Sequence, residues 1–346
     1  MLELIKNNKN KLGITVSDTR FDSSIAITKR NLRYNSVDLN IFQDSITTDT
    51  AYYRVRLVNR VGHKFPSGYP SRRAVLQFVI VGTINDTLFK SGIIGPDGEV
   101  VGIGTPYENH YDIINSQNQN QIYEIVMGDV IGNKTTVLER ADTTLKDNRL
   151  VPEGFLSTSN VYDTVKICGG AENDADFNKF TGGIEGSGKD FVHFRIPIAG
   201  FPSSFSVYSK LYFQTLPPAW LQEMFSYSSV PIDSFKTMYN AASKAPVLVD
   251  ADSIMNVLMG VAASNNQVEV ILSPDPTPDG NVILRFPKPT EVGLIRIINM
   301  NGQIMETIRM GGKIEQLPLR LPEEKGTYIV DIYIDNYRIS RKLIRL

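Results

Sequence analysis

Residues 62–73 read Gly-His-Lys-Phe-Pro-Ser-Gly-Tyr-Pro-Ser-Arg-Arg, and strand-like segments lie on both sides of them. Residues 53–57 alternate apolar and basic side chains, while residues 74–81 are almost continuously apolar, which is typical of a buried strand. Two prolines and two glycines restrict the backbone between them. The pattern predicts two strands joined by a rigid loop. This loop would hold four side chains in a set arrangement: His63, Lys64, Arg72 and Arg73.

Composition narrows the class of protein. With 346 residues the chain is long enough for two or three domains with their own cores. Its 36 basic and 37 acidic residues leave a net charge near zero, which gives no electrostatic reason to expect a nucleic-acid partner. No apolar run has the length of a transmembrane span, and residues 1–6 lack the pattern of an export signal.

Cysteine usage sets a second limit. Cys168 is the single cysteine, so the chain contains no disulfide framework and cannot attach a c-type haem, which needs two cysteines and a histidine in one motif. Any haem must therefore belong to another chain. Cys168 itself is interpreted as a small apolar residue near a turn.

The apolar periodicity predicts a mainly β protein. Residues 1–11 and a segment capped near residues 22–24 are typical of short helices, and from residue 36 the period changes to two. Polar segments at 109–120 and 169–188 interrupt the strands, so we expect a β-sandwich with long insertions. Helices are expected at 233–242 and 252–258. Strands are expected at residues 37–41, 53–57, 74–81, 86–89, 93–101, 121–127, 190–197 and 205–214.

A separate C-terminal domain is expected after a linker at 260–267. Seven short strands are predicted from residue 267 to the end, with hairpin turns at 301–302 and 335–336, which fits a small immunoglobulin-like sandwich. The predicted domains are a helical connector (1–35), a β-sandwich (36–260) and a C-terminal β-sandwich (267–346).

The first 245 residues carry several ordered motifs. Gly-His-Lys-Phe-Pro-Ser-Gly-Tyr-Pro-Ser-Arg-Arg is followed by Phe-Lys-Ser-Gly (89–92), Glu-Asn-His-Tyr-Asp (108–112), Gln-Ile-Tyr-Glu (121–124), Leu-Lys-Asp-Asn-Arg-Leu (145–150) and Tyr-Phe-Gln (212–214) before Trp220. The series resembles the non-haem, C-terminal portion of a family of bacterial multihaem c-type cytochromes. This chain departs from that family because it has no Cys-x-x-Cys-His motif. The resemblance implies that Met1 corresponds to an internal position of a longer ancestor, through a split gene or a fragment, and that the partner is a multihaem cytochrome polypeptide.

The C-terminal domain resembles another family. Ser-Pro-Asp-Pro-Thr (273–277), Asn-Met-Asn-Gly (299–302), Gly-Thr-Tyr-Ile-Val (326–330) and Lys-Leu-Ile (342–344) are similar to the C-terminal sorting domain of type IX secretion cargo in Bacteroidetes, although Asp275 replaces the usual asparagine. The resemblance implies export through the periplasm to the outer cell surface or the medium, with the type IX machinery as a partner.

Each candidate side chain has two interpretations. His63 and His110 either contact a haem of the partner or hydrogen-bond within their own loops. Arg72 and Arg73 either pair with haem propionates or join carboxylates within the sandwich. His193 is interpreted as a plain sheet position. Glu172, Asp174 and Asp176 either bind Ca²⁺ or form an exposed acidic loop. Their spacing fits no EF-hand, so the exposed loop is expected and no metal site is predicted.

Two functional hypotheses remain open. The sequence contains no nucleophile elbow, zinc-binding His-Glu-x-x-His, P-loop or dinucleotide fingerprint, so we expect no catalytic site of its own. The first hypothesis is a non-haem partner domain of a secreted multihaem cytochrome that supports extracellular electron transfer. The alternative is a cell-surface binding or adhesion protein without a redox role.

Overall fold

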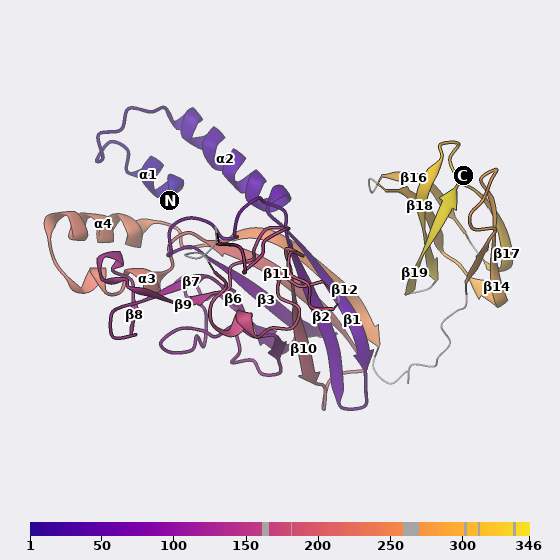
Figure 1. Cartoon of the computed structure of the whole chain (residues 1–346), viewed down its shortest axis with the longest axis horizontal. Coiled ribbons are helices and arrows are strands. Elements are labelled where there is room, and N and C mark those ends of the chain that lie inside the picture. Colours follow the sequence, from indigo (N-terminus) through magenta and orange to yellow (C-terminus); the bar gives the residue numbers. More distant parts are fainter. Residues whose placement is uncertain (161–165, 181, 259–269, 301–302, 311, 335–336) are drawn as a thin grey trace. The chain divides into compact units, whose positions relative to one another are not determined.

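The chain forms two compact units, Met1–Gly260 and Val261–Leu346. The computed structural model describes residues 1–160, 166–180, 182–258, 270–300, 303–310, 312–334 and 337–346 (Figure 1). The predicted linker and both predicted hairpin turns of the second unit lie outside these residues. None of the described helices is both long enough and apolar enough to cross a membrane.

The first unit is built on two main sheets. The first sheet has the order β1 (Val37–Ile46), β2 (Thr50–Asn59), β10 (Lys189–Pro197) and β5 (Ile113–Ile114). The second has the order β12 (Val247–Leu258), β11 (Ser204–Gln214), β3 (Arg73–Gly82) and β4 (Thr87–Ser91), with β6 (Ile122–Tyr123) also on β3. All neighbours are antiparallel except β5 and β10.

The two sheets share one hydrophobic core. Strand β2 buries every second residue, so its alternating pattern places Tyr53 and Leu57 inward. Phe78 of β3 stacks on Phe194 of β10 with ring centroids 3.9 Å apart, which joins the facing sheets at the centre. The predicted mainly β fold is confirmed.

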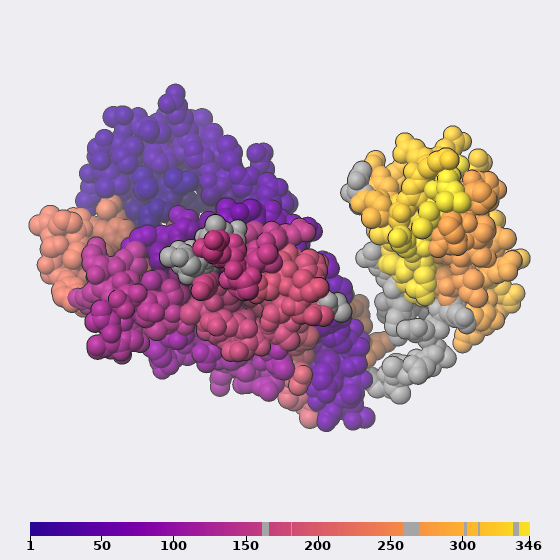
Figure 2. All heavy atoms as spheres, viewed as in Figure 1, coloured from indigo at the N-terminus to yellow at the C-terminus, as the bar shows by residue number. Residues whose placement is uncertain are grey.

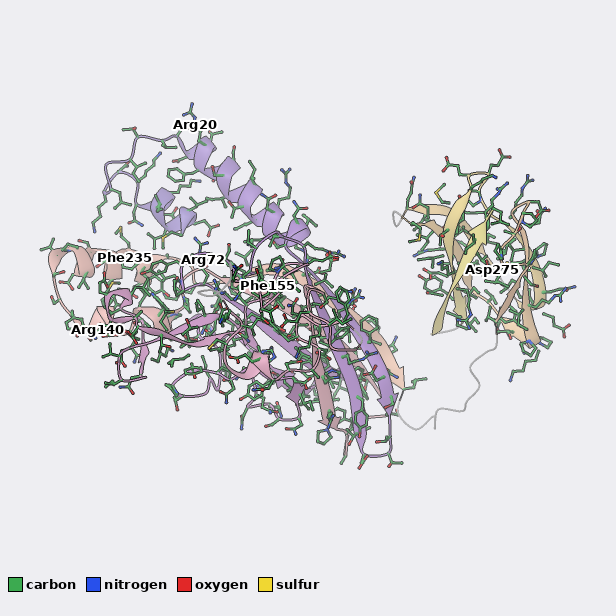
Figure 3. All side chains as sticks on the ribbon, viewed as in Figure 1. Arg20, Arg72, Arg140, Phe155, Phe235 and Asp275 are labelled. Carbon is green, nitrogen blue, oxygen red and sulfur yellow. The ribbon has the colours of Figure 1, made fainter. Side chains whose placement is uncertain are left out.

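Short helices and a third small sheet complete the unit. Leu4 of α1 (Leu2–Asn7) packs with Leu221, Met238 and Tyr239. In Figure 1 the indigo helices α1 and α2 (Asp18–Asn35) lie along one side of the unit, and Figure 2 shows the indigo N-terminal atoms on the same side. Helix α4 carries Phe235, labelled in Figure 3. The remaining elements are β7 (Ile125–Gly128), β8 (Lys134–Thr135), β9 (Thr143–Asp147), α3 (Pro218–Leu221), α4 (Val230–Ala241), η1 (Leu138–Arg140), η3 (Gly169–Glu172) and η4 (Met224–Ser226).

The helix predicted at 252–258 is wrong, because these residues belong to strand β12. Backbone pairing along β11 outweighs the weak helical preference of so short a segment. Asp252 begins the predicted helix, and Asp250 precedes it by two residues. Their carboxylates instead accept hydrogen bonds from the backbone N–H groups of Leu39 and Ile41 on β1, at 2.8 and 2.9 Å.

Three other boundaries differ from the prediction. Helix α2 begins at Asp18, four residues before the expected cap. The strand expected at 121–127 is split between β6 and β7, which pair with different sheets. The strand expected at 93–101 is reduced to one β-bridge, between Ile94 and Val100. Between these two residues the chain turns, and the Gly98 N–H donates a hydrogen bond to the Gly95 carbonyl.

The second unit is a smaller pair of antiparallel sheets around its own core. Val330 and Ile297 are fully buried at its centre. One sheet has the order β13 (Ile271–Ser273), β14 (Asn281–Glu291), β17 (Lys313–Arg320); the other has the order β16 (Ile304–Arg309), β15 (Leu294–Asn299), β18 (Gly326–Ile334), β19 (Tyr337–Arg345).

Candidate functional site

The polar loop between β2 and β3 is anchored by Asn59. Its Nδ2 donates to the carbonyl oxygens of His63 and Leu150, both at 2.8 Å, and its Oδ1 accepts from the Val61 N–H at 2.9 Å. Phe65 and Leu150 also exchange two backbone hydrogen bonds. One buried amide therefore ties the start of the loop to a segment 91 residues later.

A buried ion pair holds the same region. Lys64 Nζ lies 2.8 Å from Asp147 Oδ2, and the guanidinium of Arg149 makes two further bonds to the Asp147 carboxylate at 2.8 and 2.7 Å. Only 1% of the Asp147 side chain is exposed. Burial lowers the pKa of Lys64, and the Asp147 carboxylate opposes that effect. Lys64 therefore points into the protein and is not presented by the loop.

The other end of the loop is fixed by Arg73. Its Nε donates to Gln214 Oε1 at 2.9 Å, its Nη2 pairs with the Glu99 carboxylate, and the residue is 3% exposed. Glu99 also accepts from the Ala219 N–H of α3 at 2.9 Å. The structure thus places Arg73 on a carboxylate inside the sandwich, which is one of its two predicted interpretations.

Arg72 stays near the surface. Its Nη1 donates to the Ser67 carbonyl at 2.8 Å, which folds the half-buried side chain over its own loop; Arg72 is labelled in Figure 3. Within the described part of the chain its guanidinium is not ion-paired. Beside it, the ring of Tyr69 meets that of Trp220 edge-on, with centroids 5.9 Å apart. Arg72 is therefore the loop cation whose charge no carboxylate neutralises.

His63 is exposed at the turn of the loop. Its Nδ1 lies 3.0 Å from the carbonyl oxygen of Lys64. A carbonyl only accepts, so Nδ1 carries the proton and Nε2 keeps its lone pair. Among the residues that the structure describes, nothing hydrogen-bonds to that Nε2.

His110, in contrast, is buried with a defined tautomer. Its Nδ1 lies 3.0 Å from Gln121 Nε2 and 3.1 Å from Asn148 Nδ2. The backbone N–H groups of Tyr111 and Glu124 donate to the amide oxygens of Gln121 and Asn148, respectively. The amide nitrogen of each side chain therefore faces the imidazole. Two donors meet at Nδ1, so the proton of neutral His110 lies on Nε2.

The Nε2–H of His110 donates a hydrogen bond to Asp174. His110 Nε2 is 2.8 Å from Asp174 Oδ2, and the other oxygen accepts from the N–H groups of Asp176 and Phe177 at 2.8 and 3.0 Å. Burial opposes the charge of Asp174, but these hydrogen bonds outweigh it and lower the pKa of Asp174. The prediction of an exposed acidic loop is therefore wrong for Asp174, because its side chain is buried. It is confirmed for Glu172, which is exposed.

Two residues of β10 extend this polar cluster. Asp190 is fully buried and accepts from the Tyr123 hydroxyl at 2.5 Å; burial, followed by the charge of Asp174, raises the pKa of Asp190 well above its usual value. His193 lies on β10 as predicted, but its Nε2 hydrogen-bonds to Asp176 Oδ2 at 3.0 Å. That bond raises the pKa of His193.

The motif residues predicted separately along the chain converge in space. The loop at 62–73 contacts 147–150 and Gln214, and His110 contacts Gln121 and Asn148. Buried Lys146 completes the set by donating to the carbonyls of residues 108 and 122. Of the four candidate residues, the structure leaves His63 and Arg72 accessible and encloses His110 and Arg73.

Sequence reasoning missed Asp112 and Asp190. The only signal was that three separate segments each carry two ligand-type side chains, at 110 and 112, 174 and 176, and 190 and 193. That signal has no meaning until the fold brings the segments together.

The sequence matches no family model and no curated protein. Among solved structures, the chain is similar to a penta-heme cytochrome c552 from Thermochromatium tepidum, with a TM-score of 0.40 and 13% identity over 66% of this chain. It is also similar to HBP35 of Porphyromonas gingivalis, with a TM-score of 0.19 and 10% identity over 90% of this chain and 63% of that one. A third similar structure is the BSP domain of a biofilm associated protein, with a TM-score of 0.20 and 8% identity over 94% of this chain and 55% of that one. The chain spans 41% of the length of that cytochrome, and TM-scores this low do not define a shared fold.

Proposed function

We propose that the first unit is a non-haem partner domain that packs on a haem-bearing multihaem c-type cytochrome polypeptide, with His63 facing a haem iron of that partner. The protein would support electron transfer at the outer cell surface and would hold no haem covalently. The observation that carries the proposal is the exposed His63, whose Nδ1 is hydrogen-bonded while its Nε2 has no partner among the described residues.

The geometry of His63 matches what iron requires of an axial imidazole. A ligating histidine donates its other ring N–H to a carbonyl or carboxylate, which orients the ring and raises the basicity of the ligating nitrogen. His63 already donates Nδ1–H to the Lys64 carbonyl. Because Lys64 is held by Asp147, the loop supplies an aimed ligand with little ordering left to occur on docking.

Arg72 supplies a suitable charge beside that ligand. Lys64 and Arg73 are paired with the carboxylates of Asp147 and Glu99, whereas Arg72 donates to a neutral carbonyl. A propionate of the partner's haem would take the guanidinium in a charge-assisted hydrogen bond. The ordered motif resemblance to the non-haem portion of multihaem cytochromes supports the same partner.

The test is the spectrum of the native complex. We expect a Soret band from a haem-staining chain that co-purifies with this one, and we expect His63→Ala to convert one low-spin haem to high spin while the complex stays assembled. Arg60→Ala is the matched control, because Arg60 is exposed at the same loop and pairs with Asp38 on its own sheet. That control should leave the spectrum unchanged.

Two results would contradict the proposal. An unchanged haem spectrum in the His63→Ala complex would reduce the loop to a structural connection between two strands. A colourless protein without a haem partner would favour the alternative, a surface binding or adhesion protein.

The second unit is proposed to act as a type IX sorting domain. Its separate hydrophobic core supports this role, since a detachable signal must fold without the cargo. Deleting residues 261–346 should leave the emission of Trp220 in the first unit native-like and abolish export from a type IX-competent host. Normal export of the deleted protein would refute the sorting role, and loss of native emission would refute the independence of the first unit.

A further inference from the structure

Six histidine and aspartate side chains lie close together, two of them on β10 and four on the segments at 110–112 and 174–176. They form an inner group of His110, Asp174 and Asp190 and an outer group of Asp112, Asp176 and His193. Within each group one ligand atom per residue lies within 4.8 Å of the others.

In the inner group, His110 and Asp174 are engaged in hydrogen bonds within the protein. The amides at His110 Nδ1 keep the proton on Nε2, so that nitrogen cannot present a lone pair to a metal ion. Both oxygens of Asp174 also accept hydrogen bonds from the protein. His110 and Asp174 therefore have no free ligand atom to offer a metal ion in this arrangement.

The outer group is open. The three side chains are each about one-third exposed, at 38% for Asp112 and 31% for Asp176 and His193. His193 Nε2 lies 3.0 Å from Asp176 Oδ2 and 3.7 Å from Asp112 Oδ1. The second oxygen of Asp176, Oδ1, is buried and has no hydrogen-bond partner among the described residues. A buried carboxylate oxygen without a donor is costly, and a bound cation would satisfy it.

The charges around the outer group also favour a cation. Burial, followed by the charge of Asp174, raises the pKa of Asp112, and His193 is the single basic side chain within the outer group. Asp190, fully buried behind it, keeps one carboxyl oxygen unpartnered within the described structure and is affected by the charges of Asp174, Asp176 and Asp112. Four carboxyl groups thus lie close together, and the nearby guanidinium of Arg54, opposite His193 on β2, is already paired with Asp44.

We propose that Asp112, Asp176 and His193 bind one divalent transition-metal ion of the zinc class, with its remaining coordination positions open to water. One imidazole nitrogen and two carboxylate oxygens are a donor set suited to such ions, whereas Ca²⁺ takes six to eight oxygens.

The supporting contacts around these ligands fit the same role. Asp174 accepts the N–H of Asp176, and the carbonyl of Asp112 accepts the N–H of His193 at 2.8 Å. These two bonds fix the backbone of Asp176 and His193, and so help to position their side chains. This site is separate from His63 and does not depend on a haem partner.

The test uses the full chain, stripped with EDTA and titrated with Zn²⁺ against a chromophoric chelator. We expect one equivalent per chain, and His193→Ala and Asp176→Asn should each weaken binding at least about tenfold, since each removes one of three ligands. Co²⁺ should give the visible absorption of a low-coordinate site. Asp38→Asn is the matched control, because Asp38 lies on β1, pairs with Arg60 and belongs to neither group.

Trp220 emission checks that each variant is folded, and Asp112→Asn gives a second route to the same answer if one variant fails to fold. Stoichiometric Zn²⁺ binding that both folded variants retain would overturn the assignment of the ligands. Binding of Ca²⁺ as tight as that of Zn²⁺ would overturn the class of ion, and absence of binding to the wild-type chain would overturn the site.

Discussion

Asp147→Ala is expected to destabilise the first unit by about 3–5 kcal/mol, because it removes the partner of two buried cations at once. The carboxylate of Asp147 bonds Lys64 at 2.8 Å and Arg149 at 2.8 and 2.7 Å. With 9% of Lys64 and 10% of Arg149 exposed, neither side chain can recover full hydration without unpacking. The loss should therefore loosen the loop at residues 62–73 as well as lower the free energy of unfolding.

Urea denaturation followed by tryptophan emission measures this effect. The chain has one tryptophan, Trp220, and it lies in the first unit, so the signal reports that unit alone. Asp38→Ala is the control, because its ion pair with Arg60 is about half exposed and should contribute less than about 1 kcal/mol. Equal effects of the two substitutions would show that the buried pair is not what holds the loop.

Gly92→Ala is expected to destabilise the first unit by roughly 2–5 kcal/mol. Gly92 directly follows strand β4 and has φ +68°, a conformation that costs an L-residue roughly 1–2 kcal/mol. A Cβ there would also overlap the carbonyl oxygen of Leu76 in the central strand β3, and overpacking against backbone adds roughly 1–3 kcal/mol. The substitution would also strain the bond from the Gly92 N–H to Asn120 Oδ1 at 2.9 Å.

Gly154→Ala separates the two causes. Gly154 has a similar φ of +82°, but no atom lies within 4 Å of the position of its added Cβ. We expect only the backbone cost there, about 1–2 kcal/mol, in the same urea experiment. If both alanine variants lost the same stability, close packing against β3 would not be the reason for a glycine at position 92.

The strands of the main sheets were predictable because burial alternates locally. In β2 and β10 every second side chain enters the core, so a period of two is visible without knowledge of the partner strand. Strand β12 was not predictable in the same way. Its pairing with β11 and the bonds of Asp250 and Asp252 to β1 come from residues far away in the sequence, and these contacts override a weak local preference.

The direction of the charged side chains in the loop also depended on distant partners. The sequence correctly identified a restrained loop, since prolines and glycines act locally. It could not indicate that Lys64 and Arg73 point inward, because Asp147 lies 83 residues from Lys64 and Glu99 lies 26 residues from Arg73. Only a partner at the right place makes burial of a cation tolerable.

The sequence by itself determined that the protein is mainly β and that a stiff loop joins two of its strands, because these follow from local periodicity and backbone restriction. Tertiary structure alone decided which histidine is exposed and which aspartates meet. His110 and Asp174 are 64 residues apart, and His193 and Asp176 are 17 apart. Hydrogen bonding and charge act over a few ångströms, so a site assembled from three segments exists only once the sheets have brought those segments together.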